Sequence, residues 1–433
     1  MNERWYGSIV SKCTDAQLLS IKPLEFLESI FMKKTSSLVT RLQHLGTMPC
    51  DEASPVAAVA TPPVRTSTVR FHSLDELDHT ESLRMQGERA MSYGRMGLDT
   101  HADLEEIFVA LENGDHCFLA SSGVGAISMT LLSLLSQGDH MVCTDNVYGP
   151  VRQLDSTVLQ RMGISTSYTG GHDYEAIEAA ITPSTKILYA ESPGSLLMEM
   201  LDFPALAEIA KKHNLTFVVD NTWGSGLIYT PLDLGADISI IAGTKYVGGH
   251  SDLMLGAVVV KGEELINRIN ATQYALGYSI SADDAWLAIR GVRTMPIRMK
   301  QHAESALKVC DYFASLDEVV TIYYPAFSGD KHHDLWRRDC KGSNGLMSIE
   351  LKGSREQTRA FVDALEIFFI GYSWGGFESL VQWVRPAGLV THSYASDELR
   401  SGETQLIRLH IGLEDVDDLI ADLQQAHEVA FGG

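Results

Sequence analysis

A lysine, an aspartate and a glycine-containing turn each follow an apolar stretch of this 433-residue chain. Lys245 lies in "IAGTKYVGGHSD", and taken alone it fits a solvated loop charge, a phosphate clamp or a nucleophilic amine. Asp220 ends the apolar segment "LTFVVD", where a buried carboxylate is costly unless it meets a positive group. "SSGVGAI", residues 121–127, joins a predicted strand to a predicted helix and would offer backbone N–H groups to a phosphate.

The order of these three features decides between their separate interpretations. Alone, the turn at 121–127 is most simply a tight connection, and it matches neither the dinucleotide fingerprint nor the Walker motif. Alone, Asp220 could cap a helix, bind a metal or hold the protonated ring nitrogen of a cofactor. Because the turn and the aspartate both precede it, Lys245 is best interpreted as an amine that forms a Schiff base. Desolvation in a closed cleft would favour the neutral, nucleophilic form of this amine.

The segments that must position these residues alternate between apolar strands and helices from about residue 100. This alternation predicts a mostly parallel sheet covered on both faces, with ligands at the carboxyl ends of its strands. After about residue 290, a long helical run and separate strands predict a smaller α+β domain. The predicted strands include "HCFLA", "HMVCT", "TKILYAE", "LTFVVD", "ADISII" and "LGAVVV", and the predicted helices include "VGAISMTLLSLLSQG", ended by Gly138, and "GPVRQLDSTVLQRMG".

Composition argues against several classes of partner and compartment. The net charge of −22 disfavours nucleic-acid backbones and anionic membranes as partners. No stretch approaches the roughly 20 apolar residues that span a bilayer, and the N-terminus lacks the apolar core of a signal peptide. The cysteines form no C-x-x-C pair and the histidines show no metal-ligand spacing. We therefore expect a cytoplasmic protein with free thiols, a small-molecule substrate, no metal, and no nucleic-acid or membrane partner.

A series of short motifs runs in order along the chain: "YGRMG", "SSGVGAI", "DNVYGP", "ESPGS", "DNTW", "AGTKYVGGHSD", "DDAWLAIRGVRT", "YSWGGFESL" and "LIRLHIGLEDVDDLIADL". Together they resemble the γ-subfamily of pyridoxal 5'-phosphate (PLP) enzymes that act on cysteine and methionine precursors, and they are most similar to its bacterial cystathionine β-lyase branch. The resemblance runs from about Ser37 to the C-terminus. It implies the α/β, PLP-dependent transferase-like fold (aspartate aminotransferase, fold type I), with a mostly parallel central sheet and a smaller C-terminal α+β domain.

The resemblance also implies a role for individual residues. Lys245 would bind PLP covalently and then move the substrate proton, Asp220 would bind the ring nitrogen, and Tyr148 would stack on the ring as a second catalytic residue. It assigns the phosphate to Gly123, Val124 and Thr244, with Tyr93 and Arg95 from a neighbouring subunit, and the substrate to Ser373, Trp374 and Arg408, the last as a bidentate clamp on the α-carboxylate. From the residues alone, Tyr148 and Trp374 could instead pack in a core, Arg95 could be a surface cation and Arg408 half of a buried ion pair.

Local sequence near these residues favours one reaction of the family. Trp374 in "YSWGG", Ala242 in "IIAGTK" and the motif "ESPGS" are all similar to the β-lyase branch. The sequence therefore predicts β-elimination on cystathionine or a related S-substituted cysteine, giving a thiol, pyruvate and ammonia. The alternatives are a γ-lyase or γ-synthase of the same family, and a non-catalytic PLP-binding regulatory protein.

Two positions depart from well-known cystathionine β-lyases. Met96 stands where those enzymes have a second arginine for the distal end of cystathionine, and Gln153 stands where they have an acidic residue facing the distal ammonium. Loss of both charges predicts weaker recognition of that end, so cysteine, cystine or another S-substituted cysteine could be the better substrate. Arg152 is near enough in sequence to substitute in part.

The sequence predicts four parts of the chain. Residues 1–36 form an N-terminal extension of unknown role, with Met32 as an alternative start. Residues 37–98, rich in proline and small residues near their middle, form an arm that contacts a neighbouring subunit. Residues 99–290 form the PLP-binding domain and residues 291–433 the C-terminal domain. The resemblance implies a homotetramer built of two dimers that share their active sites.

Overall fold

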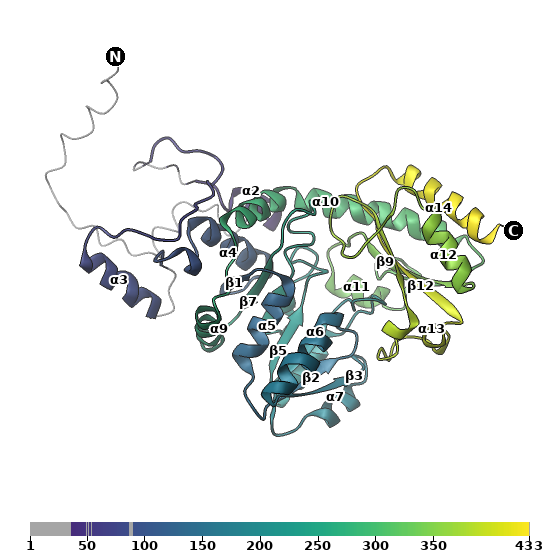
Figure 1. Cartoon of the computed structure of the whole chain (residues 1–433), viewed down its shortest axis with the longest axis horizontal. Coiled ribbons are helices and arrows are strands. Elements are labelled where there is room, and N and C mark those ends of the chain that lie inside the picture. Colours follow the sequence, from purple (N-terminus) through teal and green to yellow (C-terminus); the bar gives the residue numbers. More distant parts are fainter. Residues whose placement is uncertain (1–35, 49, 51, 53, 86–89, 433) are drawn as a thin grey trace, which may run out of the picture.

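The structure, a computed structural model, describes residues 36–432 apart from residues 49, 51, 53 and 86–89. The predictions for residues 1–35, including the alternative start at Met32, lie outside the described residues. The described chain forms a large α/β region followed by a smaller region with its own sheet (Figure 1). Within this part of the chain, no helix combines the length and apolar character needed to cross a membrane.

The large region is built on a seven-stranded sheet in the order β1-β7-β6-β5-β4-β2-β3. Strand β7 runs antiparallel to its neighbours β1 and β6, and the other adjacent pairs are parallel, which confirms the mostly parallel sheet. The strands are β1 (His116–Ala120), β2 (His140–Thr144), β3 (Ser165–Thr169), β4 (Thr185–Glu191), β5 (Thr216–Asp220), β6 (Ile238–Ile241) and β7 (Gly256–Val260).

Both faces of this sheet are buried, as continuous apolar strands require. Phe217 and Val219 of β5 belong to one hydrophobic cluster, whereas Val218 between them belongs to another. Helices cover the sheet, and α5 and α6 lie in front of it in Figure 1. The helical elements up to this domain's end are α2 (Leu38–His44), α3 (Leu74–Met85), η1 (Gly94–Met96), α4 (Asp99–Glu112), α5 (Gly123–Leu134), α6 (Gly149–Leu154), η2 (Asp155–Leu159), η3 (Gln160–Met162), α7 (Tyr174–Ala180), α8 (Phe203–Lys212), η4 (Pro231–Leu234) and α9 (Glu263–Leu276).

Two predicted helices differ from their observed form. Helix α5 ends at Leu134, four positions before Gly138, because the chain turns extended at Leu135. The helical segment from Gly149 is continuous to Met162, but it passes through a π turn at η2 and a 3-10 turn at η3. Sequence periodicity does not reveal such changes of winding, since they shift the register by a single residue.

The C-terminal region contains a five-stranded sheet in the order β10-β11-β12-β9-β8, in which only β10 and β11 are parallel. Its elements are α10 (Ala282–Ala314), β8 (Val319–Tyr323), α11 (His333–Asp339), β9 (Leu346–Lys352), α12 (Arg355–Ala364), β10 (Phe369–Ile370), β11 (Leu380–Val384), η5 (Pro386–Gly388), α13 (Asp397–Ser401), β12 (Thr404–His410) and α14 (Val416–Phe431). The predicted boundary at residue 290 falls inside α10, a helix of 33 residues. The domain boundaries stay a prediction.

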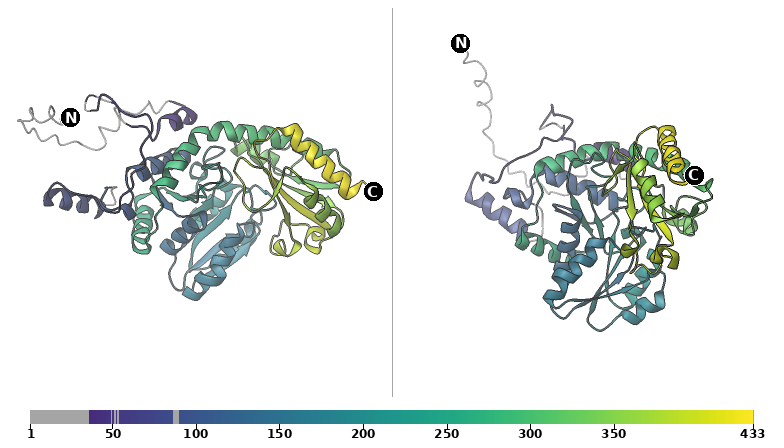
Figure 2. Two further views of the ribbon diagram at one scale, coloured as in Figure 1. Left: turned by 45° about the horizontal axis from the view of Figure 1, so that its top comes forward. Right: turned by 45° about the vertical axis from the view of Figure 1, so that its right-hand side comes forward.

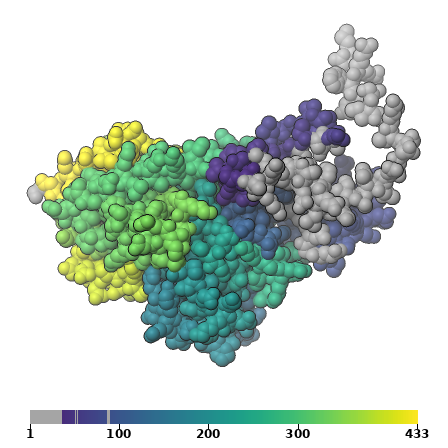
Figure 3. All heavy atoms as spheres, turned by 180° about the vertical axis from the view of Figure 1, so that it is seen from behind, coloured from purple at the N-terminus to yellow at the C-terminus, as the bar shows by residue number. Residues whose placement is uncertain are grey.

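The described part of the arm, within residues 37–98, packs less closely than the rest. Helix α3 has no buried residue, and Val56, Val59, Leu74 and Met85 expose most of their apolar surface. Figures 2 and 3 show α3 and the segment before it projecting from the large region. Apolar surface exposed on a projecting segment is typical of a contact with another chain.

Candidate active site

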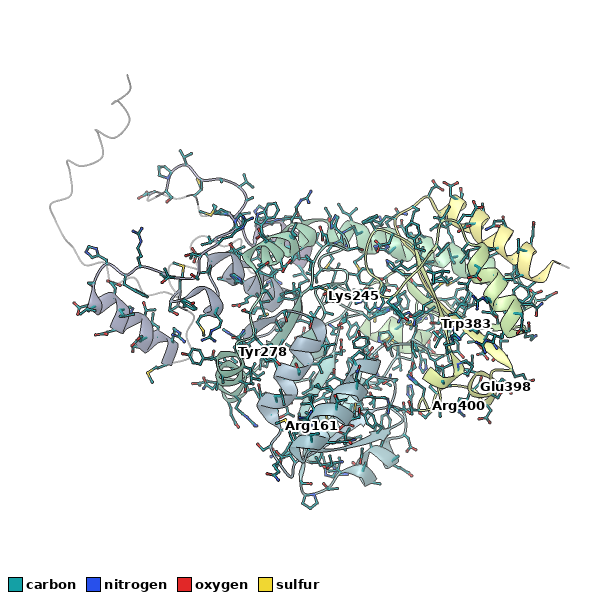
Figure 4. The ribbon with its side chains drawn as sticks, in the orientation of Figure 1. Arg161, Lys245, Tyr278, Trp383, Glu398 and Arg400 are labelled. Atoms are coloured by element: carbon teal, nitrogen blue, oxygen red, sulfur yellow. The ribbon has the colours of Figure 1, made fainter. Side chains whose placement is uncertain are left out.

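The carboxyl ends of four parallel strands meet at one cavity of about 430 Å³. Glu191 ends β4 and Asp220 ends β5, while Tyr148 follows β2 and Lys245 follows β6. The C-terminal region closes the cavity with the segment 372–374 and with Arg408 of β12. Lys245 lies between the two regions in Figure 4. This is the edge of a parallel sheet at which ligands bind.

One end of the cavity is formed by the first turn of α5. The Ser122 hydroxyl accepts the N–H of Gly125 at 3.0 Å, but the N–H groups of Gly123 and Val124 have no acceptor within the helix. Both residues line the cavity. A Cβ at Gly123 would lie 2.7 Å from the Cβ of Ala242, so only glycine fits this close approach. Free N–H groups and the helix dipole make this end suited to a phosphate.

Thr244 also lines the cavity, but its hydrogen bonds differ from those predicted. Its hydroxyl donates to the carbonyl oxygen of Leu255 at 3.2 Å and accepts the N–H of Leu255 at 2.9 Å. Its backbone N–H also donates to that carbonyl oxygen at 3.2 Å. Because both of its donors are directed to Leu255, a phosphate contact from Thr244 would have to displace one of these bonds.

Asp220 is buried on the wall of the cavity. Its Oδ1 atom accepts the Thr222 N–H at 3.0 Å and the Thr222 hydroxyl at 2.6 Å. Burial raises the pKa of the Asp220 carboxyl, while Thr222 and the charge of Lys245 oppose that rise. A ligand that brought a positive N–H group to this carboxylate would stabilise its ionised form. Sequence reasoning missed Thr222, although it stands in the motif "DNTW".

The amine of Lys245 is held across the cavity. Its Nζ donates to the Ser373 hydroxyl at 2.5 Å and lies 5.2 Å from the centre of the Trp374 ring. Burial, with a smaller contribution from Arg408, lowers the pKa of Lys245 to about 8, and Asp220 opposes this. A substantial fraction of the amine is therefore neutral in mildly basic solution, which is the nucleophilic form.

Tyr148 stands at the N-cap of α6 with 41% of its surface exposed toward the cavity and solvent. Its backbone N–H donates to Glu191 Oε2 at 2.5 Å. Burial raises the pKa of the Glu191 carboxyl well above its ordinary value, and the hydrogen bond from Tyr148 opposes that rise. Glu191 was not singled out from the sequence, although it ends an apolar strand as Asp220 does.

Arg408 lies on β12, opposite Gln382 of β11 and Ser348 of β9. Its Nη1 is 3.5 Å from the carbonyl oxygen of Ser195, a long contact, and burial lowers the pKa of its guanidinium to about 10. Among the described residues, no carboxylate lies within ion-pair distance of it. A half-buried cation that lines a cavity without an ion pair is suited to binding an anionic ligand group.

Three of the predicted residues lie away from this cavity in their own chain. Arg95 donates to the carbonyl oxygen of Tyr274 at 2.8 Å and stacks 4.9 Å over the Tyr274 ring. Tyr93 pairs with Thr68 of the arm. Met96 lines a separate cavity of about 570 Å³ beside Tyr274. The prediction that Tyr93 and Arg95 act from a neighbouring subunit stays a prediction, and their distance from their own cavity accords with it.

Gln153 is also outside the cavity, exposed on α6, whereas Arg152 lines the cavity. A helix turns about 100° per residue, so neighbours such as these face different directions. Gln153 therefore does not line the cavity of its own chain, and its predicted contact with the substrate stays a prediction. The predicted residues that line the cavity are Gly123, Val124, Tyr148, Asp220, Thr244, Lys245, Ser373, Trp374 and Arg408.

Comparison with known proteins decides the family. The model of the Cys/Met metabolism PLP-dependent enzymes matches residues 45–428. The chain belongs to this family. A cystathionine beta-lyase of Bordetella avium is 56% identical over 388 residues, which cover 89% of this chain and 96% of the relative. The cystathionine beta-lyase of Escherichia coli (strain K12) is 38% identical, over 83% of this chain and 91% of its own.

A solved structure of the same family has the same fold. The cystathionine gamma-lyase from Lactobacillus plantarum, in complex with L-serine, has a TM-score of 0.79 and 33% sequence identity, and the match covers 91% of this chain and 99% of that one. The chain thus has the fold type I architecture of PLP-dependent enzymes, as the sequence predicted.

PLP is the cofactor of the family, and the cavity has the groups that PLP requires. The first turn of α5 offers free N–H groups to its phosphate, and Asp220 offers a buried carboxylate to its ring nitrogen. Lys245 offers an amine of lowered pKa, about 8, from the opposite wall. These N–H groups, the carboxylate and the amine fit the groups of PLP. The residues that would hold the cofactor are Gly123, Val124, Asp220 and Lys245.

Proposed function

We propose that the protein is a PLP-dependent carbon–sulfur β-lyase that acts on cystathionine or a related S-substituted cysteine. With water, the reaction yields a thiol, pyruvate and ammonia. The observation that carries the proposal is the unpaired Arg408 in the same cavity as Lys245 and Asp220, an arrangement suited to an amino-acid substrate. The 56% identity to a cystathionine beta-lyase over most of both chains supports the β-lyase reaction.

Each residue of the cavity would have a separate role in the reaction. Bound PLP supplies an electron sink that stabilises negative charge on the substrate Cα. Arg408 holds the substrate α-carboxylate and so fixes the direction of the Cα–H bond. The Lys245 amine removes the Cα proton, with the Ser373 hydroxyl 2.5 Å from Nζ to keep it in place. Tyr148 covers the site at the mouth of the cavity.

Product analysis on the purified holoenzyme tests the proposal. With cystathionine as substrate, we expect pyruvate and a free thiol in equal amounts, and no activity in Lys245→Ala. Dominant 2-oxobutyrate, or replacement by an added thiol, would instead assign a γ-lyase or γ-synthase, the activity named for the Lactobacillus plantarum relative. A holoenzyme that releases no thiol from any S-substituted cysteine would indicate a non-catalytic PLP-binding protein.

We also propose that the protein is a homotetramer of two dimers that share active sites, with the arm crossing between subunits. The exposed apolar side chains of the arm, and the distance of Tyr93 and Arg95 from their own cavity, support this proposal. A cytoplasmic location is proposed from the cysteines: in the described part of the chain Cys50, Cys117, Cys143, Cys310 and Cys340 are free thiols. Cys13 lies outside the described residues.

A further inference from the structure

The loop of residues 373–376 packs against Lys245 in an unfavourable conformation. Ser373 has φ of +85° and Gly375 has φ of +90°. A Cβ at Gly375 would lie 2.9 Å from the carbonyl carbon of Lys245 and 2.9 Å from the backbone nitrogen of Tyr246, so the two segments are in close contact. Because strained backbone persists only where surrounding contacts hold it, this loop needs a partner that fixes it against Lys245.

The side chain of His410 contacts the 373–376 loop. His410 is the last residue of β12 and pairs with Leu380, the first residue of β11 after the loop. Its Nε2 atom lies 3.1 Å from the backbone nitrogen of Gly375 and 3.1 Å from the carbonyl oxygen of Gly376. An imidazole protonated at Nδ1 accepts the Gly375 N–H, and one protonated at Nε2 donates to Gly376. Nε2 is therefore the atom that contacts the loop in either neutral tautomer.

The surroundings of His410 keep its ring neutral. His410 is 1% exposed, and burial lowers its pKa to about 3, with smaller contributions from the charges of His302, Arg408 and Lys245. The hydrogen bond to Gly376 opposes this fall. Burial also lowers the pKa of His302, on α10, to about 4. The contact between His410 and the loop is thus one of a neutral imidazole across the pH range in which the protein is folded.

A histidine at this position carries a cost that an apolar residue would avoid. Its Nδ1 atom is buried and has no hydrogen-bond partner among the described residues. Its ring centre lies 5.8 Å from that of Tyr246 and 5.1 Å from that of His302. The Tyr246 ring in turn lies 5.4 Å from the ring of Trp374 in the loop. Because a leucine could fill such a cluster, the feature that sets the histidine apart is its polar contact with the loop through Nε2.

Through the loop, this contact reaches the reactive amine. Ser373 and Trp374 directly precede Gly375 in the chain. The Ser373 hydroxyl is 2.5 Å from Nζ of Lys245, and the centre of the Trp374 ring is 5.2 Å from it. Burial is the main cause of the lowered pKa of Lys245. A loop that moved away from Lys245 would therefore remove the hydrogen-bond acceptor of Nζ and admit water to the amine.

We propose that His410 is a positioning residue: its Nε2 atom holds the 373–376 loop against Lys245 and so keeps Ser373 and Trp374 at the reactive amine. The inference rests on the proposed β-lyase function, in which the Lys245 amine removes the substrate proton. His410 is buried and does not line the cavity, so it acts through the loop and not on the substrate.

Substitutions of different reach test which nitrogen of His410 matters. Glutamine places its amide about as far from the backbone as Nε2, whereas asparagine places it near the position of Nδ1. We expect His410→Gln to retain most of the kcat/KM of the holoenzyme for cystathionine. His410→Asn and His410→Leu should each lose about tenfold, as for the loss of one hydrogen bond.

His140→Leu is the matched control. His140 is also buried, and its ring contacts the hydroxyls of Thr185 at 2.7 Å and Ser167 at 3.0 Å. It begins β2, whereas the cavity lies at the carboxyl ends of the strands. We expect His140→Leu to lose stability but to keep the kcat/KM of the wild-type protein.

The ionisation of Lys245 in the PLP-free protein gives a readout that does not depend on turnover. The pH dependence of its acetylation by acetic anhydride, followed by mass spectrometry of the modified peptide, gives the pKa. In His410→Asn and His410→Leu the amine should be better hydrated, so its pKa should rise from about 8 toward the ordinary value of lysine. His410→Gln and His140→Leu should keep it near 8, because a loss of stability alone does not hydrate the amine.

The comparison between the two amides decides the outcome even where His410→Leu does not fold, which circular dichroism shows. A Lys245 pKa that stays near 8 in folded His410→Asn would overturn the proposal, as would equal losses of kcat/KM in His410→Gln and His410→Asn. If the Lys245 pKa rises as expected but the wild-type holoenzyme releases no thiol, the β-lyase function fails and the role of His410 at Lys245 stands.

Discussion

The amine of Lys245 and the hydroxyl of Ser373 lie 2.5 Å apart, although 128 positions separate them in the sequence. Lys245 follows a strand of the large sheet, and Ser373 lies between β10 and β11 of the C-terminal sheet. Ser373 has φ of +85°, a region that residues with a Cβ rarely adopt. The contact thus joins the two regions at the reactive amine. It also places the strained backbone of Ser373 in the active site.

Substitutions at Ser373 should separate the contribution of its hydroxyl from that of its backbone. We predict that Ser373→Ala lowers kcat/KM about tenfold, because Nζ of Lys245 loses its acceptor. Ser373→Gly should lose the same activity but raise the free energy of unfolding by about 1 kcal/mol, since glycine adopts positive φ without strain. Steady-state kinetics and urea unfolding of both variants check this. Wild-type activity in both would show that the hydroxyl does not position the amine.

The lowered pKa of Lys245, about 8, predicts a pH-dependent stability of the protein without PLP. Between about pH 8 and the ordinary lysine value, the unfolded chain binds more protons than the folded one, so stability from this group rises with pH. The cost of burying the charge is fully present below about pH 8. We therefore predict that Lys245→Met stabilises the PLP-free protein by about 1 kcal/mol near neutral pH, and that this gain shrinks toward about pH 10.

Urea unfolding at both pH values measures this difference. Lys300→Met is the control, because the Lys300 side chain is 76% exposed and its charge costs little in the folded chain. A gain for Lys245→Met that did not change with pH would mean that packing, and not titration, is its cause.

The close approach of Gly123 to Ala242 predicts a specific loss of cofactor binding. In Gly123→Ala the new Cβ would lie 2.7 Å from the Ala242 Cβ, so the first turn of α5 must shift away from the cavity. We predict PLP affinity about tenfold lower or more, because the free N–H groups of the turn lose their position. Gly342→Ala is the control, since a Cβ there meets no heavy atom within 4 Å. Equilibrium PLP titration of both variants measures the effect, and equal affinities would exclude a phosphate at this turn.

The proposed sharing of active sites predicts complementation between two inactive variants. Lys245→Ala and Arg95→Gln should each lose activity, because one lacks the amine and the other the phosphate contact. Unfolded together and reassembled, the two chains form mixed dimers in which one site receives both wild-type residues. We expect about one quarter of wild-type activity from equal random mixing. No recovery, in mixtures shown to contain hybrid oligomers, would mean that Arg95 does not act across subunits.

Several features of the fold and site could be predicted from the sequence because they depend on local pattern. Runs such as "LTFVVD" are apolar without alternation, which predicts strands buried on both faces and hence a parallel sheet. Lys245, Asp220 and the turn at Gly123 each follow such a run, and parallel strands bring their carboxyl ends to one edge. The order of residue types along the chain was therefore sufficient to predict a Schiff-base lysine beside a phosphate-binding turn and a buried carboxylate, whereas PLP and the roles of the other residues came from the resemblance to a known family.

Other features depend on contacts between distant segments, and only the tertiary structure decided them. Arg152 lines the cavity and Gln153 does not, which depends on how α6 packs against the sheet. The hydrogen bonds of Thr244 depend on the position of Leu255. Arg95 stacks on Tyr274 of α9, away from its own cavity, and Ser373 reaches Lys245 from another region. Sequence fixes which groups a segment carries, but its partners depend on how separate elements pack, which no local pattern specifies.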